Sequence, residues 1–503
     1  MNFADAIKNE QKWTLTENGA VALNTTSDAL LDLFSTIGAL RQRKAVEVET
    51  MVEEAYKEDP LNTVKCLFYA RDIREGLGER DTFRIALRYL ANNHSEAVSE
   101  NISLIGEYGR WDDIYCLVGT PCENKMWAVV YEQFRNDIGN MNMEKPISLL
   151  AKWLKSVDTS SEESKRLGRL TAEKLGMVNG ETGWKKYTSY RFYLKTMRSY
   201  IKVVEKKMCS NAWGEIKYDE VPSRAAMLYR EAFKKHDEER YDEFINKVNS
   251  GEAKINASTL YPYDIINKYL TGDYWDGYWS DEENATIEAL WKNLPNYVAP
   301  NTNAVIIADT SDSMYSNSKK IPMCSAVGLA IYFAERNIGA YHNLWMNFSS
   351  SPSWQKLKGS SLIQKLNSLN MRNWNGSTNL HSAFMLVLDT AVKNHISQDE
   401  MPKSIVVISD MEIDFCGDRD WSFYDQMKAE FAQYGYDIPQ IIFWNVNSMS
   451  NVFHADSSRK GVVLCSGHST TTFKNLINSI GMTPVEYMMS VLNNKRYEAV
   501  KIA

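Results

Sequence analysis

The hydrophobic residues change their spacing once along the chain. Up to about residue 290 they recur at the period of an amphipathic helix, in pieces separated by short breaks that contain Gly, Asn, Asp or Pro. Many medium helices with short connections are typical of stacked antiparallel pairs, as in an α-solenoid, although no repeat of fixed period stands out. The helical pieces fall near residues 28–56, 62–73, 80–92, 124–138, 146–156, 164–176, 186–208, 223–248 and 282–293. The pattern predicts an all-α helical-repeat domain over residues 1–295.

In the rest of the chain, short β-branched and apolar runs alternate with helical periodicity. The runs lie at about 303–309, 341–348, 404–409, 440–446 and 461–465, and the helical pieces near 320–336, 379–395, 421–434 and 471–492. Such alternation predicts parallel strands joined by crossover helices, so we expect a doubly wound, mainly parallel sheet over residues 304–503. Pro295, Pro300 and the polar stretch 301–303 mark a linker at 296–303. The predicted fold class is α followed by α/β.

Composition and charge exclude several classes of protein. The chain has 503 residues, of which 44% are hydrophobic, and no low-complexity tract, so it should be globular in more than one domain. Seven scattered cysteines, never in a Cys-x-x-Cys arrangement, argue against a disulfide framework or a zinc site. There is no apolar run of transmembrane length and no charged, apolar leader. We expect a soluble, cytoplasmic protein with no membrane partner.

Chemistry is suggested first by the strand that ends at residue 309. Residues 305–314, Val-Ile-Ile-Ala-Asp-Thr-Ser-Asp-Ser-Met, bring Asp309, Ser311 and Ser313 into one turn. Carboxylate and hydroxyl oxygens suit a hard divalent cation, although Ser and Asp are also common in turns and helix N-caps. Thr378 precedes a predicted helix and Asp410 follows another buried strand. Because parallel sheets bind ligands at the carboxyl ends of their strands, these five residues can converge on a magnesium (Mg2+) site.

This combination resembles a von Willebrand factor A domain, in which the five residues are the positions of a metal-ion-dependent adhesion site. The resemblance implies a bound divalent cation with one open coordination position, which an acidic side chain of a protein partner would complete. An aspartyl-phosphate enzyme would need a second Asp two residues after Asp309, where this chain has Ser311. Because no motif places a general acid or a nucleophile, we expect no enzymatic activity. Metal-assisted phosphoryl chemistry is the remaining enzymatic alternative, with Asp312, Glu412 and Asp414 as extra carboxylates.

A basic segment lies in the helical part, between residues 184 and 207. It carries eight Lys or Arg residues against the single acid Glu205, with five Tyr or Phe rings between them. At helical spacing, residues 191, 195, 198, 202 and 206 form one narrow stripe. The stripe is either an ordinary solvated helix face or a surface that neutralises phosphates while aromatic rings stack on bases. The predicted RNA-binding residues are Lys185, Lys186, Arg191, Lys195, Arg198, Lys202 and Lys206.

Three further segments resemble Ro-type (TROVE) RNA-binding proteins and an uncharacterised family related to them. These are residues 66–80, which contain Arg71, Arg74 and Arg80, and residues 213–257 and 409–414. The resemblance implies a ring or horseshoe of HEAT-like helical repeats, closed or flanked by the A domain, that holds structured or defective non-coding RNA. We therefore predict a non-enzymatic RNA-binding scaffold. The alternative is a metal-dependent protein-protein interaction scaffold without RNA.

Overall fold

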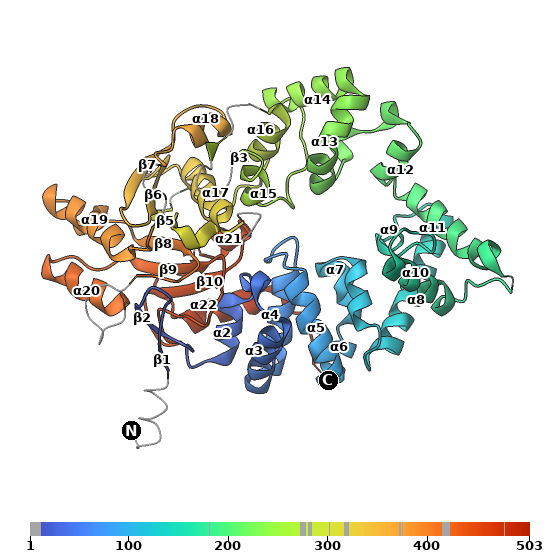
Figure 1. Cartoon of the computed structure of the whole chain (residues 1–503), viewed down its shortest axis with the longest axis horizontal. Coiled ribbons are helices and arrows are strands. Elements are labelled where there is room, and N and C mark those ends of the chain that lie inside the picture. Colours follow the sequence, from blue (N-terminus) through green and yellow to red (C-terminus); the bar gives the residue numbers. More distant parts are fainter. Residues whose placement is uncertain are drawn as a thin grey trace.

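The chain folds into an N-terminal helical region followed by an α/β region built on a mostly parallel sheet (Figure 1). This confirms the predicted order of a helical part and then a sheet. The computed structural model describes residues 12–180, 182–271, 278–279, 284–300, 302–315, 321–371, 374, 376–414, 423–476 and 478–502. The sequence gives little strand signal before residue 290. Even so, the described residues there include two short antiparallel strand pairs: β1 (Trp13–Leu15) with β2 (Val21–Leu23), and β3 (Leu270–Thr271) with β4 (Tyr278–Trp279).

The helical region consists of α2 (Ala29–Thr36), α3 (Ala45–Glu58), α4 (Pro60–Arg71), α5 (Asp81–Asn93), α6 (Ser95–Ser99), α7 (Ile105–Tyr108), α8 (Glu123–Asn142), α9 (Leu150–Trp153), α10 (Glu162–Lys174), α11 (Thr188–Tyr200), α12 (Val204–Cys209), α13 (Ser223–His236), α14 (Glu238–Ser250), α15 (Pro262–Ile266) and α16 (Ala285–Lys292). Local chemistry sets several of their ends. Asp59, for example, accepts a hydrogen bond from the Asn62 amide at the start of α4, where Pro60 occupies the first turn. No helix among the described residues combines the length and the apolar character needed to cross a membrane.

The sheet has the strand order β10-β9-β8-β5-β6-β7, and only β7 runs antiparallel to its neighbour. Its strands are β5 (Ala304–Asp309), β6 (Leu344–Phe348), β7 (Ser353–Lys356), β8 (Ser404–Ser409), β9 (Gln440–Asn445) and β10 (Val462–Ser466). Strands β5, β8, β9 and β10 are buried along their whole length, which explains their continuous apolar runs. The five predicted strands are confirmed. Strand β7 was not predicted, because its Ser-Trp-Gln-Lys sequence lies half-exposed at the edge of the sheet.

Six helices accompany the sheet: α17 (Ile321–Arg336), α18 (Leu362–Asn367), α19 (Leu380–Lys393), α20 (Phe423–Gln433), α21 (Thr471–Leu476) and α22 (Pro484–Leu492). The helical periodicity over 471–492 predicted one piece, but the structure has two helices there. Gly481 adopts a positive φ of 81° between them, and Thr483 with Glu486 forms a capping box that starts α22. Glycine conformation and a new N-cap therefore interrupt an otherwise continuous apolar period.

Both ends of the helical region pack on the α/β region, so the molecule closes into a ring (Figure 1). At one end α2 packs on β10 and α22, and at the other α15 packs on α17. The Gly38 amide donates to Ser466 Oγ at 3.0 Å, and a Cβ at Gly38 would stand 2.6 Å from the Gly467 Cα. Only glycine allows this close approach. The buried apolar residues of the two regions consequently form one continuous core.

The N-terminal segment of the described chain contacts the α/β region, and the C-terminal segment contacts the helical region. Near the N-terminus, Leu23 pairs with Phe453 of the α/β region through two backbone hydrogen bonds of 2.9 Å. Near the C-terminus, Arg496 binds Asp72, and Lys501 exchanges hydrogen bonds with Asn101, both in the helical region. These contacts join residues about 400 positions apart in sequence, and they hold the ring closed.

Candidate cation site and basic cavity

The five residues of the predicted cation site lie at the carboxyl edge of the sheet. Strand β5 ends at Asp309, and Asp410 directly follows β8, its parallel neighbour. Asp309, Ser311, Thr378 and Asp410 are buried, while Ser313 is half-buried in the short turn after β5. The Asp312 amide donates to the Gly376 carbonyl at 3.3 Å, which brings the loop of Thr378 against this turn. Three segments distant in sequence therefore meet at one place.

Hydrogen bonds fix the orientation of both carboxylates. The Ser311 amide donates to Asp309 Oδ1 at 2.8 Å, and the Ser409 hydroxyl donates to Asp309 Oδ2 at 2.6 Å. The Glu412 amide donates to Asp410 Oδ1 at 3.2 Å. The hydroxyls of Ser311 and Ser313 lie 3.1 Å apart. The site thus has its oxygen atoms arranged by the backbone turns that follow β5 and β8.

The electrostatics of the two carboxylates are unfavourable without a cation. Burial, together with repulsion from Asp410, raises the pKa of Asp309 to about 7. Burial, with repulsion from Glu412, raises the pKa of Asp410 to about 6. Among the described residues, no Lys, Arg or His forms an ion pair with either carboxylate. A buried pair of acids that no basic side chain neutralises fits a bound cation.

The donor set suits a hard divalent ion such as Mg2+, which takes oxygen ligands and keeps some of its waters. In the described part of the chain, no group of three or more His, Cys, Asp or Glu side chains is placed to hold a metal. Any cation at this site would therefore depend on the hydroxyls of Ser311, Ser313 and Thr378 as well as on the two carboxylates. The chemistry of the residues present fits such an ion.

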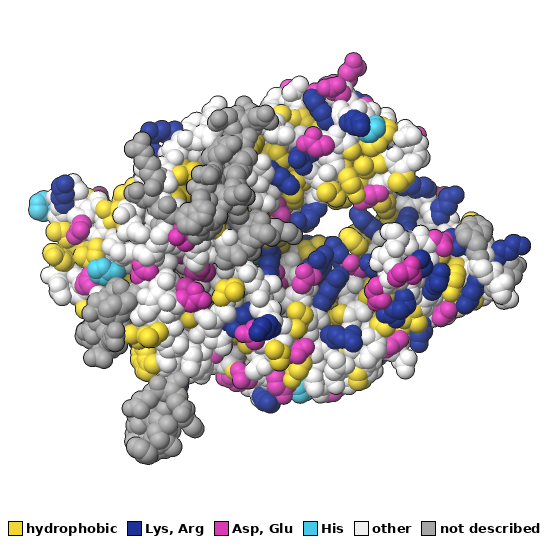
Figure 2. All heavy atoms as spheres, viewed as in Figure 1, with side chains coloured by type: hydrophobic (Ala, Val, Ile, Leu, Met, Phe, Trp, Pro, Cys, Tyr) yellow, Lys and Arg dark blue, Asp and Glu magenta, His cyan; other side chains and the backbone are white. Residues whose placement is uncertain are grey.

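A second feature is a cavity of about 1620 Å³ inside the ring. Its lining comes from segments between residues 41 and 321, which means from nearly the whole circuit of helices. Figure 2 shows dark-blue basic side chains around the opening. Twelve Lys or Arg residues line the cavity, against five acids, although the whole chain carries a net charge of −7. The basic residues are Arg41, Arg71, Arg74, Arg80, Arg110, Lys152, Arg191, Lys195, Arg198, Lys206, Arg224 and Lys268.

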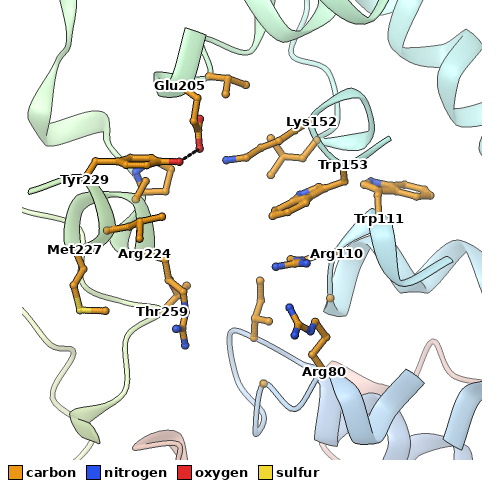
Figure 3. Close-up of a pocket in the computed structure, with 18 of the residues that line it drawn as sticks. Arg80, Arg110, Trp111, Lys152, Trp153, Glu205, Arg224, Met227, Tyr229 and Thr259 are labelled. Carbon is orange, nitrogen blue, oxygen red and sulfur yellow. Dashed lines mark hydrogen bonds between the residues drawn. The ribbon is translucent and has the colours of Figure 1, made fainter. Parts of the chain in front are cut away.

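The two walls of the cavity differ in chemistry (Figure 3). On one wall, Arg110 lies over the Trp153 ring at 4.1 Å from its centroid, and Lys152 Nζ lies 5.5 Å from the same centroid. On the opposite wall, the Tyr229 hydroxyl donates to Glu205 Oε1 at 3.3 Å above Arg224. The first wall therefore combines basic side chains with an indole ring. The second wall, which faces it, carries the hydrogen-bonded pair of Tyr229 and Glu205 beside Arg224.

The structure corrects the predicted basic stripe. Helix α11 ends at Tyr200, and Lys202 adopts a positive φ of 51° before α12 begins at Val204. The stripe over residues 191–206 is therefore not continuous, because a left-handed residue turns the chain and rotates the second helix. Of the seven predicted residues, Arg191, Lys195, Arg198 and Lys206 line the cavity, whereas Lys185, Lys186 and Lys202 do not.

The four stripe residues that reach the cavity differ in their bonding. Arg198 donates to the carbonyls of Ala151 at 2.8 Å and Leu154 at 2.7 Å, and burial lowers the pKa of its guanidinium. Arg191 pairs with Asp158 at 2.8 Å. Lys195 is exposed, and no ion pair to it occurs among the described residues. Arg198 thus stabilises the fold, while Lys195 presents its charge to solvent.

The sequence pattern gave no signal for five of the twelve basic residues that line the cavity. Arg110, Lys152, Arg224 and Lys268 stand singly in their segments and meet only because the ring closes. The segment 66–80 did single out Arg71, Arg74 and Arg80, and all three line the cavity. All three are also bound within the protein: Arg71 pairs with the buried Asp113 at 2.7 Å, Arg80 pairs with Asp81 at 2.9 Å, and Arg74 donates to the Glu107 carbonyl.

Comparison with known proteins finds relatives without an assigned activity. The chain is 26% identical over 521 residues to "Uncharacterized protein L728" of Acanthamoeba polyphaga mimivirus, an alignment that covers 95% of this chain and 87% of the viral protein. Residues 303–501 match a domain of unknown function, DUF7788. Residues 16–126 and 124–301, which together make up more than half of the chain, match the domain of unknown function DUF2828. The chain therefore belongs to the DUF2828 family.

Proposed function

We propose that this protein is a non-enzymatic RNA-binding scaffold, similar to Ro ribonucleoproteins, that holds structured or defective non-coding RNA in the basic cavity of its helical ring. The observation that supports this function is the concentration of twelve Lys and Arg residues around one cavity in an otherwise acidic chain. A cluster of this kind attracts phosphates, because each neutralised phosphate releases counterions from the nucleic acid. In this proposal the RNA contacts the inside of the ring and not the face of a single helix.

The ion pairs inside the cavity indicate which of its basic side chains are free to contact phosphates. Lys152, Lys195 and Lys268 form no ion pair among the described residues, so RNA would not have to displace a carboxylate to reach them. Trp153 lies beside Lys152, and its indole ring is only half-buried. Aromatic side chains stack on unpaired bases, since a base in a duplex has its faces covered. The cavity therefore suits an unpaired segment of a structured RNA.

We further propose that the α/β region is a von Willebrand A domain and that the helices form HEAT-like repeats. In this proposal Asp309, Ser311, Ser313, Thr378 and Asp410 hold Mg2+. The ion would neutralise the two buried carboxylates and offer an open position to an oxygen ligand. The buried acid pair without a basic partner supports this part of the proposal.

A binding titration with matched variants tests RNA recognition. The natural chain and a Lys152→Gln, Lys195→Gln, Lys268→Gln variant are titrated against a labelled hairpin RNA with an unpaired 3′ extension, at several salt concentrations. The control changes Lys235, Lys393 and Lys428 to Gln, because these lysines are exposed and lie outside the cavity lining. We expect the cavity variant to bind more weakly, with a shallower salt dependence, and the control to bind as the natural chain does. Equal affinity in all three proteins would remove the cavity as the RNA site.

The second candidate is a metal-dependent protein-protein interaction scaffold, favoured by the same buried carboxylate pair. A partner would then complete the cation's coordination with an acidic side chain. Copurification of a protein that is lost both with a chelator and in Asp309→Ala would support this alternative. If RNA copurifies and no protein depends on the metal, the alternative fails.

A further inference from the structure

The loop of the N-terminal hairpin lies on the rim of the candidate cation site. Residues 16–20 join β1 to β2, and Asn18 stands at their tip. Asn18 Nδ2 donates to the Glu412 carbonyl at 2.7 Å and lies 3.4 Å from Thr378 Oγ1, the hydroxyl proposed as a cation ligand. A side chain from the N-terminal hairpin therefore contacts a site whose other residues lie between 309 and 410.

The rest of the loop binds the segment that follows Asp410. The Thr16 hydroxyl donates to the Ile413 carbonyl at 2.6 Å, and the Glu17 amide donates to Glu412 Oε2 at 2.7 Å. Gly19 forms a β-bridge with Asp414. The hairpin loop thus fixes residues 412–414 from one side.

Residues 412–414 in turn orient two of the proposed ligands. The Glu412 amide donates to Asp410 Oδ1 at 3.2 Å. Asp414 forms a reciprocal pair with Thr378, since the Thr378 amide donates to Asp414 Oδ1 at 2.9 Å and the Asp414 amide donates to the Thr378 carbonyl at 2.9 Å. A continuous series of hydrogen bonds therefore runs from the hairpin loop to Thr378 and Asp410.

We propose that the N-terminal hairpin is a positioning element of the cation site, that Asn18 is its positioning residue, and that cation binding and docking of residues 12–23 stabilise each other. This inference rests on the proposed cation site. A threonine hydroxyl has two acceptor lone pairs, so Thr378 Oγ1 can accept from Asn18 and still ligate a cation. Coupling of this kind is reciprocal: whatever the hairpin adds to cation affinity, the cation adds to hairpin docking.

The hairpin also provides a matched control. Leu15 belongs to the same short strand pair but is 61% exposed, and it takes no part in the contacts to residues 412–414. Leu15→Ser should leave the cation site unchanged. Asn18→Ala removes the amide that reaches Thr378 and Glu412. Asn18→Asp replaces this amide with a carboxylate, which attracts a cation but cannot donate to the Glu412 carbonyl.

The test uses Mn2+ as the probe, with the free ion measured by electron paramagnetic resonance in titrations of the full chain. We expect Asn18→Ala to raise the Mn2+ dissociation constant about tenfold and Leu15→Ser to leave it unchanged. Asn18→Asp should bind Mn2+ more tightly than Asn18→Ala, because its added charge lies at the site. A purely structural hydrogen bond would give the reverse order, since the aspartate both loses the donor and repels Glu412.

Hydrogen exchange of the natural chain gives a second, variant-free measurement. We expect amides of residues 13–23 to exchange several-fold more slowly with saturating Mn2+ than without it. If the natural chain binds no Mn2+, the proposed cation site fails and this inference fails with it. If it binds Mn2+ but neither Asn18→Ala nor hydrogen exchange shows an effect, the site stands and the hairpin's role is refuted. Equal loss of binding in Asn18→Ala and Leu15→Ser would likewise refute positioning by Asn18.

Discussion

Replacing Arg496 with Met should remove one of the contacts that join the C-terminal segment to the helical region. Arg496 Nε donates to Asp72 Oδ2 at 2.9 Å, Nη2 donates to Asp72 Oδ1 at 3.2 Å, and Nη1 donates to Glu107 Oε1 at 2.9 Å. Its guanidinium also lies 4.7 Å from the centroid of the Tyr108 ring. One side chain of the C-terminal segment therefore binds two acids and a ring of the helical region.

The magnitude follows from the burial of Asp72, whose side chain has no exposed surface. Removing one partner of a buried ion pair costs about 3–5 kcal/mol, because the remaining charge is left without compensation. Asp72 keeps two other donors, the Tyr497 hydroxyl at 3.3 Å and the Arg74 amide at 3.1 Å. The expected loss of unfolding free energy for Arg496→Met therefore lies at the lower end, about 3 kcal/mol.

A double-mutant cycle measures this loss. Denaturant unfolding is followed by tryptophan fluorescence for the natural chain, Arg496→Met, Asp72→Asn and the double variant. Because Asp72→Asn removes the charge that Arg496→Met leaves buried, the double variant should lose less stability than the two single variants together. Additive single losses, or a loss below about 1 kcal/mol for Arg496→Met, would refute a stabilising buried ion pair between Arg496 and Asp72.

Three further outcomes are expected. Saturating Mg2+ at about 100 times its dissociation constant should stabilise the natural chain by about 2.7 kcal/mol in thermal denaturation, and Asp309→Ala should abolish this gain; an equal gain in the variant would place the ion elsewhere. Lys195→Gln should reduce the salt slope of RNA binding by about 0.7 and Lys235→Gln should not; identical slopes would exclude Lys195 as a phosphate contact. Burial lowers the pKa of His454 to about 4. Because the unfolded chain protonates this residue first as the pH falls, His454 should contribute a loss of about 2 kcal/mol between pH 7 and pH 5. Urea unfolding at both pH values measures this contribution as the difference between the pH dependence of the natural chain and that of His454→Gln, and an equal pH dependence in the two proteins would contradict it.

Local patterns predict the elements of this fold well where a single interaction dominates. The fully buried strands β5 and β8 appear in the sequence as continuous apolar runs, because both of their faces are covered. Their parallel order places Asp309 and Asp410 at one edge of the sheet. The same reasoning failed for the basic stripe, since helical periodicity cannot reveal that Lys202 adopts a left-handed conformation.

The sequence by itself determined the order of a helical part and a mainly parallel sheet, and it supplied the five oxygen-bearing residues at the strand ends. The order of the regions follows from hydrophobic periodicity, and the five residues are identified by their positions next to predicted strands and helices. Only the tertiary structure decided that the helices return to the sheet and enclose a cavity, and that Asn18 reaches Thr378. These features depend on contacts between residues hundreds of positions apart, such as Gly38 with Ser466. Such contacts form because packing of whole elements brings the residues together, and no local pattern encodes that packing.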